Sequence, residues 1–300
     1  MQWVRNYNAN PEQNRSYRVA LFLTLGGNLV LAVAKGIVAY LSGSAAVYAD
    51  AANSVSDVIY SVLMVLGLWM ALRPPDLSHP QGHSRYEPLV GLVVTASMAI
   101  AGFEAARNAI ARYTQNALDP ITLDLPVIIL LASALIKFFM YLSISRISKR
   151  ILSPTLATTA RDNLSDVLAS LAAFLGVLGS NLIHPLADPV AGFIVALWIF
   201  RNAFLAGREN LGFLTGRGAS RDEVKAFIDA AEEVPGVLKV HHIMSEYAGP
   251  RLVIDLHINV DGQTTLQVSH EISDEVIHKL ESFPNVDRVY VHVEPHDWKD

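Results

Sequence analysis

The sequence predicts a bundle of six membrane-spanning helices followed by a small soluble α+β domain. Three observations support this fold class. First, 52% of the 300 residues are hydrophobic and only 17% are charged, which is too apolar for an ordinary soluble domain of this size. Second, apolar runs dominate residues 16–206, whereas residues 207–300 have an ordinary soluble composition. Third, basic residues occur at alternate ends of the successive apolar runs.

The six helices are predicted from the length of the apolar runs. A helix needs about 20 mostly apolar residues to cross a bilayer. Six segments meet this requirement: 17–41, 45–72, 88–112, 121–145, 156–180 and 186–207. They define a transmembrane domain over residues 17–207, preceded by a segment at 1–16 and followed by a domain at 208–300. We expect no cleavable signal peptide, because residues 1–16 are polar and contain no apolar core.

The orientation follows from the connectors between these helices. The connectors at 41–44, 113–120 and 179–188 contain no Lys or Arg. The opposite ends of the helices carry the following basic residues: Arg5, Arg15, Arg18, Arg73, Arg85, Arg146, Lys149, Arg150, Arg208 and Arg217. Because positive charge marks the cytoplasmic side, both termini are predicted to be cytoplasmic.

The C-terminal part has the pattern of a compact α+β module. Ser220 and Glu223 form a capping-box pattern that opens a helix at about 221–234. Alternating apolar residues predict strands at 237–248, 251–260 and 286–295, with a second helix at about 266–282. The order α-β-β-α-β favours two helices on one face of a three-stranded sheet, which is a ferredoxin-like arrangement.

The net charge and the cysteine content bear on nucleic-acid binding and on cysteine chemistry. The formal net charge of −5 argues against nucleic acid as a partner. The chain has no cysteine, so it forms neither disulfides nor thiolate metal sites.

Two matching pairs of oxygen-bearing side chains lie inside the predicted spans. Asn53 and Asp57 are four residues apart in the second helix, and Asp162 and Asp166 are four apart in the fifth. Residues at this spacing share one helix face. If the two faces meet, three carboxylates and one amide form a cation site at which metal and protons compete. The alternative is that these carboxylates pair with the nearby bases Lys35, Lys137, Arg107 and Arg161, or line a water pocket.

The cytoplasmic connector between the second and third helices brings three further metal ligands together. Asp76, His79 and His83 lie within eight residues, and one carboxylate with two imidazoles suits zinc or another transition metal. The alternative is a polar loop with a structural Pro-Gly turn.

The C-terminal domain is rich in histidine. Seven histidines and one glutamate are candidates for a cytoplasmic metal site: His241, His242, His257, His270, His278, His292, Glu294 and His296. His292 and Glu294 are two residues apart and therefore share one strand face. The alternative is that these are scattered surface histidines.

These patterns resemble the cation diffusion facilitator family. The resemblance covers nearly the whole chain and rests on "GSAAVYADAANSVSD", "HPQGHSRYEP" and "RDNLSDV". It implies six spans, cytoplasmic termini, a ferredoxin-like cytoplasmic domain and a homodimer in the plasma membrane, which is the inner membrane of a bacterium. It also implies that the chain is a transporter, not an enzyme, and exports divalent metal in exchange for protons.

The resemblance carries over three sets of metal-binding residues. Asn53, Asp57, Asp162 and Asp166 match the family's transport site within the membrane. Asp76, His79 and His83 match the connector site of its zinc/iron branch. The third set matches the cytoplasmic dimer-interface cluster and comprises His241, His257, His270, His292 and Glu294. Glu294 stands where that branch has an aspartate.

The transport site departs from the zinc-transporting branches, which have at least one histidine where this chain has Asp162. An all-oxygen site suits harder ions such as Mn²⁺, and the set resembles that of the manganese-transporting branch. We therefore predict Mn²⁺ as the main cargo and Fe²⁺ as the next. Zn²⁺ exchange remains an alternative, because Zn²⁺ binds more tightly than Mn²⁺ at most sites.

Two further hypotheses concern the class of protein. A membrane-anchored metal sensor or storage protein would use the cytoplasmic histidines, but an anchor has no use for three buried carboxylates. A channel is disfavoured by the closed four-ligand set and by the lack of a repeated pore-lining pattern.

Overall fold

A computed structural model describes residues 4, 11–42, 45–114, 125–182, 184 and 186–296. The chain divides into two compact units, Met1–Leu211 and Gly212–Asp300. Most of the predicted N-terminal segment, namely residues 1–3 and 5–10, lies outside the described part, as does residue range 115–124.

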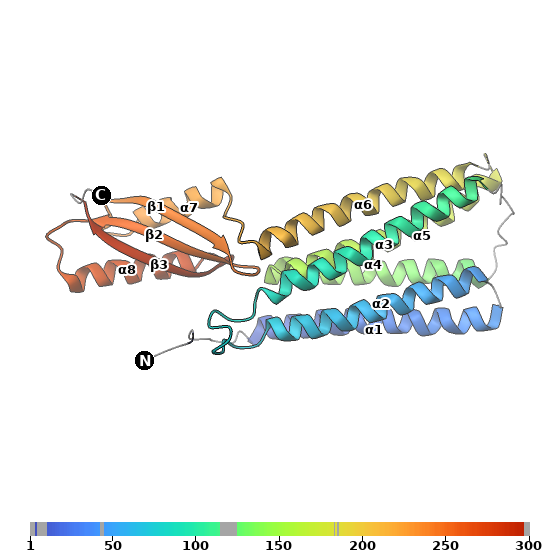
Figure 1. The fold of residues 1–300 in the computed structure, drawn as a ribbon, viewed down its shortest axis with the longest axis horizontal. Helices are drawn as coiled ribbons and strands as arrows, with labels where there is room; N and C mark the ends of the chain where they lie inside the picture. The colour runs from blue at the N-terminus through green and yellow to red at the C-terminus, as the bar shows by residue number, and fades with distance from the viewer. Residues whose placement is uncertain are drawn as a thin grey trace. The chain divides into compact units, whose positions relative to one another are not determined.

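The first unit is built from six long helices, α1 (Pro11–Ser42), α2 (Ala45–Ala71), α3 (Tyr86–Thr114), α4 (Leu125–Ile151), α5 (Pro154–Leu182) and α6 (Ala187–Leu214). They run side by side as a bundle (Figure 1). Several extend beyond the predicted apolar runs, because charged residues end an apolar segment without ending a helix. Lys149 and Arg150, for example, lie in the last turn of α4, beyond its predicted apolar run.

Five of the six helices meet the length and composition required of a membrane span, within the described part of the chain. The qualifying segments are Asn14–Leu41, Ser54–Ala71, Tyr86–Ala111, Leu131–Ile151 and Pro189–Leu214. Helix α5, predicted as the fifth span, is not among them. It has 29 residues, which is long enough, but its first half contains Arg161, Asp162 and Asp166. Composition alone therefore identifies five spans and not the six predicted.

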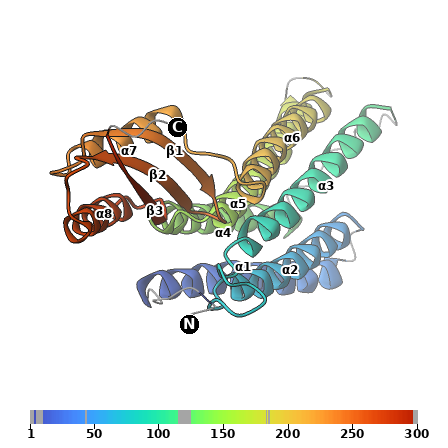
Figure 2. The same ribbon diagram turned by 60° about the vertical axis from the view of Figure 1, so that its left-hand side comes forward.

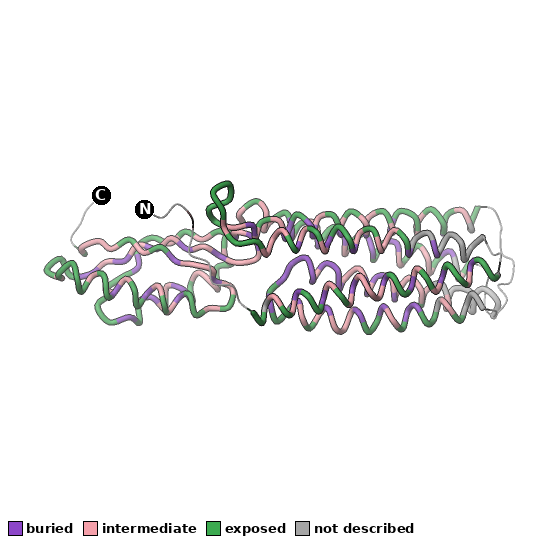
Figure 3. The backbone as a smooth tube through the Cα atoms, turned by 90° about the horizontal axis from the view of Figure 1, so that it is seen from below, coloured by how far each residue is buried: buried purple, intermediate pink, exposed green. Residues whose placement is uncertain are grey.

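The outer surface of the bundle is apolar. Large hydrophobic side chains are strongly exposed on several helices, for example Phe22 (78%), Phe204 (70%) and Leu135 (57%). Figure 3 shows exposed and buried residues alternating along each helix. An apolar exterior of this extent is characteristic of a protein whose solvent is lipid.

Small and polar residues join the helices inside the bundle. An added Cβ at Gly102 of α3 would lie 3.1 Å from the Ile199 side chain of α6, so this glycine leaves room for Ile199 between the two helices. Near the start of α3, the buried Glu87 carboxylate accepts hydrogen bonds from Tyr17, at 2.7 Å, and from Ser153. These contacts connect α1, α3 and the short link before α5.

The second unit is the predicted α+β module. Its elements are α7 (Arg221–Glu232), β1 (Lys239–Tyr247), β2 (Leu252–Val260), α8 (Leu266–Glu281) and β3 (Val286–Pro295). The sheet order is β1-β2-β3, with β1 antiparallel and β3 parallel to β2. The capping box predicted at Ser220 and Glu223 is present at the start of α7. The predicted order α-β-β-α-β is confirmed.

The core of this module lies between the helices and one face of the sheet. Alternate residues of β2 are buried, and they pack with Phe227 of α7 and with Val276 and Leu280 of α8. Both helices therefore cover the same face (Figure 2). The intervening residues of β2, including His257, lie on the opposite face, and this alternation leaves the second face of the sheet for polar side chains.

Candidate functional site

The predicted intramembrane site is organised around a lysine. The Lys137 Nζ of α4 lies 3.0 Å from Asp57 Oδ2 of α2 and 2.8 Å from Asp166 Oδ2 of α5. The lysine side chain is only 7% exposed, and the two carboxylates are 22% and 29% exposed. The second and fifth helices therefore bring Asp57 and Asp166 to one cation. This is the pairing that the salt-bridge alternative anticipated for Lys137.

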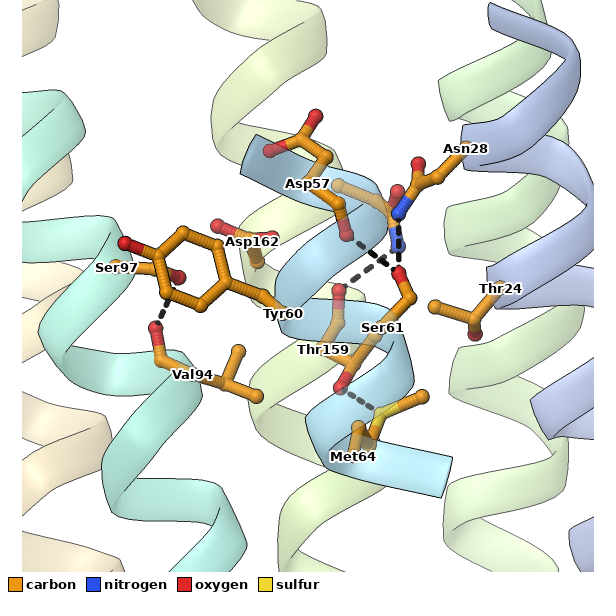
Figure 4. Close-up of a pocket in the computed structure, with 11 residues that line it drawn as sticks. Thr24, Asn28, Asp57, Tyr60, Ser61, Met64, Val94, Ser97, Thr159 and Asp162 are labelled. Carbon is orange, nitrogen blue, oxygen red and sulfur yellow. Dashed lines mark hydrogen bonds between the residues drawn. The ribbon is translucent and has the colours of Figure 1, made fainter. Parts of the chain in front are cut away.

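Asp162 joins Asp57 at a small polar cavity. The cavity measures about 20 Å³, which is room for about one water molecule. Figure 4 shows Asp57, Tyr60 and Asp162 around it, with the hydroxyl of Ser61 nearby. The remaining lining residues are Thr24, Asn28, Met64, Val94, Ser97, Thr159 and Asn163.

Two amides at this cavity were not predicted as site residues. Asn28 Nδ2 donates to Ser61 Oγ at 2.8 Å, and Asn163 Nδ2 donates to the Thr159 carbonyl at 2.9 Å. These donations fix which amide atom is the oxygen, and both Oδ1 atoms are buried without a hydrogen-bond partner among the described residues. They are neutral oxygen acceptors beside two carboxylates. Asn163 directly follows Asp162 in "RDNLSDV", so the position of Asn163 near the site could have been predicted from this motif.

The fourth predicted ligand, Asn53, is on α2 one turn before Asp57, but its side chain lies outside the described residues. Another proposed base, Arg161, has a different role. Its Nη1 lies 2.6 Å from Glu209 Oε2 of α6, so Arg161 joins α5 to α6 and pairs with a carboxylate outside the predicted site.

The connector residues form a compact cluster. The ligand atoms of Asp76, His79 and His83 all lie within 4.8 Å of one another. Asp76 Oδ2 is 3.5 Å from His83 Nε2, and the two imidazole ring centroids are 4.5 Å apart. The backbone N–H of His79 donates to Asp76 Oδ1 at 2.7 Å and holds the pKa of this exposed carboxyl below its ordinary value. Gly82, with φ of +98°, closes the turn that places both rings together.

A second cluster lies on the open face of the C-terminal sheet. The ligand atoms of His241, His257 and Glu294 lie within 4.8 Å of one another. The carboxylate of Glu294 is 3.3 Å from His241 Nε2, 3.3 Å from His257 Nδ1 and 3.4 Å from His292 Nε2. Four of the five predicted residues of this domain therefore meet at one carboxylate.

A β-bulge gives this cluster its shape. The register of β1 against β2 shifts between Val240 and His242, so that two residues of β1 oppose His257 of β2. As a result, the rings of both His241 and His242 lie near His257, with centroids 5.5 and 4.8 Å away. Strict alternation would send one of the two to the helix-covered face, which is why the sequence pattern did not predict that His242 approaches His257.

The fifth predicted residue, His270, lies elsewhere in this domain. It is on α8, 74% exposed, and its Nε2 lies 3.6 Å from Asp274 Oδ2 one turn along the same helix. The single chain therefore does not bring His270 to Glu294.

The first unit is an apolar helical bundle in which two carboxylates contact the buried ammonium of Lys137. The second unit carries clustered imidazoles. Together these features define an integral membrane protein that handles cations. Comparison with known proteins identifies the family. The family model "Cation efflux transmembrane domain" matches residues 21–215, and "Cation efflux protein, cytoplasmic domain" matches residues 219–296. The chain belongs to the cation efflux family, also called the cation diffusion facilitators. It is a cation efflux transporter and not an enzyme, with a cytoplasmic C-terminal domain.

Relatives match along most of the chain. An uncharacterized transporter of Methanocaldococcus jannaschii is 32% identical over 93% of this chain and 99% of its own length. The manganese efflux system protein MneS of Bacillus subtilis is 28% identical over 92% of this chain and 95% of its own length. A solved C-terminal domain of MamM is 29% identical, covering 26% of this chain and all of that domain, with a TM-score of 0.25.

Proposed function

We propose that the chain exports Mn²⁺ from the cytoplasm, with Fe²⁺ as the next cargo, in exchange for protons. The observation that carries the proposal is that Asp57 and Asp166, from two helices, lie close enough to contact one cation, the ammonium of Lys137. A pair of carboxylates that one ammonium contacts can also face one metal ion. Asp162 supplies a third carboxylate, and Asn53 is the proposed fourth ligand.

The choice of Mn²⁺ rests on ligand chemistry. The proposed ligands are all oxygens, and Asn28 and Asn163 add two neutral oxygens at the same cavity. Oxygen ligands suit Mn²⁺, whereas imidazole favours zinc and copper. The relative MneS is a manganese efflux system protein, which agrees with this choice.

The transport cycle we propose is alternating access. The cavity residues come from α1, α2, α3 and α5, mostly from the parts of these helices nearest their cytoplasmic ends under the proposed topology. Metal would reach Asp57 and Asp162 along this route and displace protons. After the bundle opens outward, protons would bind the carboxylates and release the ion.

This cycle requires α5 to be a sixth span despite its polar first half. Its charged and polar residues have partners inside the bundle, as Asp166 has in Lys137 and Arg161 has in Glu209. Paired groups of this kind are tolerated within a membrane domain when they face the bundle interior. With six spans both termini are cytoplasmic. The domain boundaries then follow as proposed, with the membrane domain at 17–207 and the cytoplasmic domain at 208–300.

We further propose that the protein is a homodimer in the plasma membrane, the inner membrane if the cell is bacterial. The open, histidine-bearing face of the C-terminal sheet would lie at the dimer interface, and metal bound at His241, His257, His292 and Glu294 would stabilise the dimer. His270 is left out of this proposed ligand set, since it lies beside Asp274 and not beside Glu294 of its own chain.

A competition assay with metal-loaded proteoliposomes tests the proposed cargo. Mn²⁺, Fe²⁺ and Zn²⁺ are offered singly and in pairs, and proton movement is followed with a pH-sensitive dye inside the vesicles. We expect Mn²⁺ to move best and to drive counterflow of protons. Vesicles that move Zn²⁺ but not Mn²⁺ would contradict the assignment.

The clustered imidazoles favour a second role beside transport, which is metal sensing or storage by the cytoplasmic domain. His241, His257 and Glu294 are already within ligating distance of one another, without any role for the membrane domain. Metal binding that is lost in His257→Ala while the rate of transport in vesicles stays at the wild-type value would support this separate role.

A further inference from the structure

Lys137 occupies the space between two proposed ligands of the transport site. Its Nζ is 3.0 Å from Asp57 Oδ2 and 2.8 Å from Asp166 Oδ2, and the side chain is almost fully buried. The ammonium group donates a hydrogen bond to Asp57 and forms an ion pair with Asp166, so it contacts two different carboxylates at once. The lysine therefore stands in the place that a metal ion shared by Asp57 and Asp166 would take.

The position of Lys137 in the bundle means that its ammonium must compete with a metal ion for Asp57 and Asp166. It projects from α4, whereas the two carboxylates come from α2 and α5. A buried charge is stable only when paired, so three carboxylates close together favour a nearby cation. A metal ion cannot contact both Asp57 and Asp166 in this arrangement without moving the ammonium away from at least one of them.

We propose that Lys137 is a tethered counter-cation, meaning a positive group fixed to the protein that the transported ion must displace. The proposal rests on the proposed function of Asp57, Asp162 and Asp166. Its consequence is that Lys137 lowers the affinity of the site for metal and speeds metal release, because the ammonium returns to the carboxylates as the ion leaves.

The same contact selects for divalent ions. A monovalent ion carries no more charge than the ammonium that it would displace, and the ammonium is already held in place by the chain. A divalent ion carries twice that charge and also reaches Asp162. Lys137 therefore excludes monovalent ions from a site whose carboxylates would otherwise attract them.

Replacing the lysine by an uncharged residue of similar length tests the proposal. In Lys137→Met the competitor is gone, so we expect the Kd for Mn²⁺ at the transport site to fall about tenfold or more, the effect of about one charged hydrogen bond. Transport in proteoliposomes should show a lower KM and a lower maximal rate. Na⁺ should inhibit Mn²⁺ binding by the variant more strongly than binding by the wild type.

Two further variants separate charge from structure. Lys137→Arg keeps the positive charge and should keep an affinity near that of the wild type. Lys149→Met changes an exposed lysine later in the same helix, α4, and should leave Kd and KM unchanged. Titrations use the full-length protein in detergent, and the transport-site signal is defined as the heat that Asp166→Asn removes.

The outcomes are distinct. Tighter binding by Lys137→Met, with Lys137→Arg unchanged, supports the tethered counter-cation; an unchanged or weaker Kd in Lys137→Met overturns it. If Lys137→Met folds only when purified with Mn²⁺, that dependence also supports the proposal. If it does not fold even then, Lys137→Arg decides, and a tightened Kd in that variant overturns the proposal. Failure of the wild type to move Mn²⁺ is a different result, which refutes the proposed function instead.

Discussion

His257 of β2 and His292 of β3 are register partners in a parallel strand pair, and their ring centroids lie 4.9 Å apart. Both imidazoles face the carboxylate of Glu294. This relationship places four of the five candidate metal ligands of the C-terminal domain on its sheet, and leaves only His270 on a helix.

The first prediction concerns this cluster. His257→Ala should weaken metal binding by the cytoplasmic unit, residues 212–300, by at least about tenfold. Loss of a residue that only orients a metal ligand already lowers metal affinity by about this factor, and His257 is a proposed ligand itself. His270→Ala should have a much smaller effect, since His270 faces Asp274 on α8. Calorimetric titration of both variants with Zn²⁺ and Mn²⁺ is the measurement. Equal losses would show that His270 reaches the cluster, for instance from a second chain.

The second prediction concerns the connector. Gly82 has φ of +98°, a conformation that costs a residue with a side chain about 1–2 kcal/mol. Gly82→Ala should therefore loosen the turn that holds His79 and His83 together and weaken Zn²⁺ binding there. Titration of a full-length chain that also carries Asp166→Asn and His257→Ala isolates this site. Undiminished Zn²⁺ binding by the Gly82→Ala chain would mean that the turn does not organise the connector ligands.

The third prediction concerns helix packing. A Cβ added at Gly91 of α3 would lie 2.0 Å from Asn210 Oδ1, and the Asn210 amide is held by hydrogen bonds to Thr158 and to the Ala206 carbonyl. Gly91→Ala should destabilise the bundle by about 1–3 kcal/mol, the usual cost of overpacking.

Gly36→Ala is the matched control, because an added Cβ at Gly36 meets nothing within 4 Å. It should be neutral or slightly stabilising, since alanine is the better helix former. Thermal unfolding of both variants in detergent makes the comparison. Equal stability of the two variants would contradict the packing of α3 against α6.

The fourth prediction concerns selectivity. Asp162→His would introduce an imidazole beside Asp57 at the cavity, and imidazole favours zinc. The variant should therefore shift the transport ratio from Mn²⁺ toward Zn²⁺, measured by competition in proteoliposomes. A matched Asp162→Asn variant, which keeps an oxygen ligand, should lose rate without gaining a preference for Zn²⁺. An unchanged metal ratio in Asp162→His would show that this position does not set selectivity.

Much of the fold could be predicted from the sequence, because hydropathy and strand alternation are local properties. The six long helices follow from the hydropathy of the chain, and the α-β-β-α-β order of the second unit follows from its capping and alternation patterns. The composition of α5 was the exception. Its ionisable residues, such as Arg161 and Asp166, lower the apolar content of the helix, and only their partners on α4 and α6 explain how they are accommodated.

The sites were predictable in part. Spacing along a helix or strand brought Asp162 with Asp166 and His292 with Glu294, because neighbours at these spacings share a face. Spacing cannot tell which of several bases meets a carboxylate, so Lys137 was one of four possible partners. Nor can it reveal a bulge, which moved His242 beside His257. These features depend on contacts between elements that are distant in the chain.

Transport by proteoliposomes containing the wild type, Asp57→Ala or Asp166→Ala is the most direct test of the central claim, that these carboxylates form the Mn²⁺ transport site. With a pH gradient imposed, the wild type should accumulate Mn²⁺ and dissipate the gradient. Each variant, shown to be folded by size-exclusion chromatography, should do neither. Full Mn²⁺ transport by either folded variant would contradict the account.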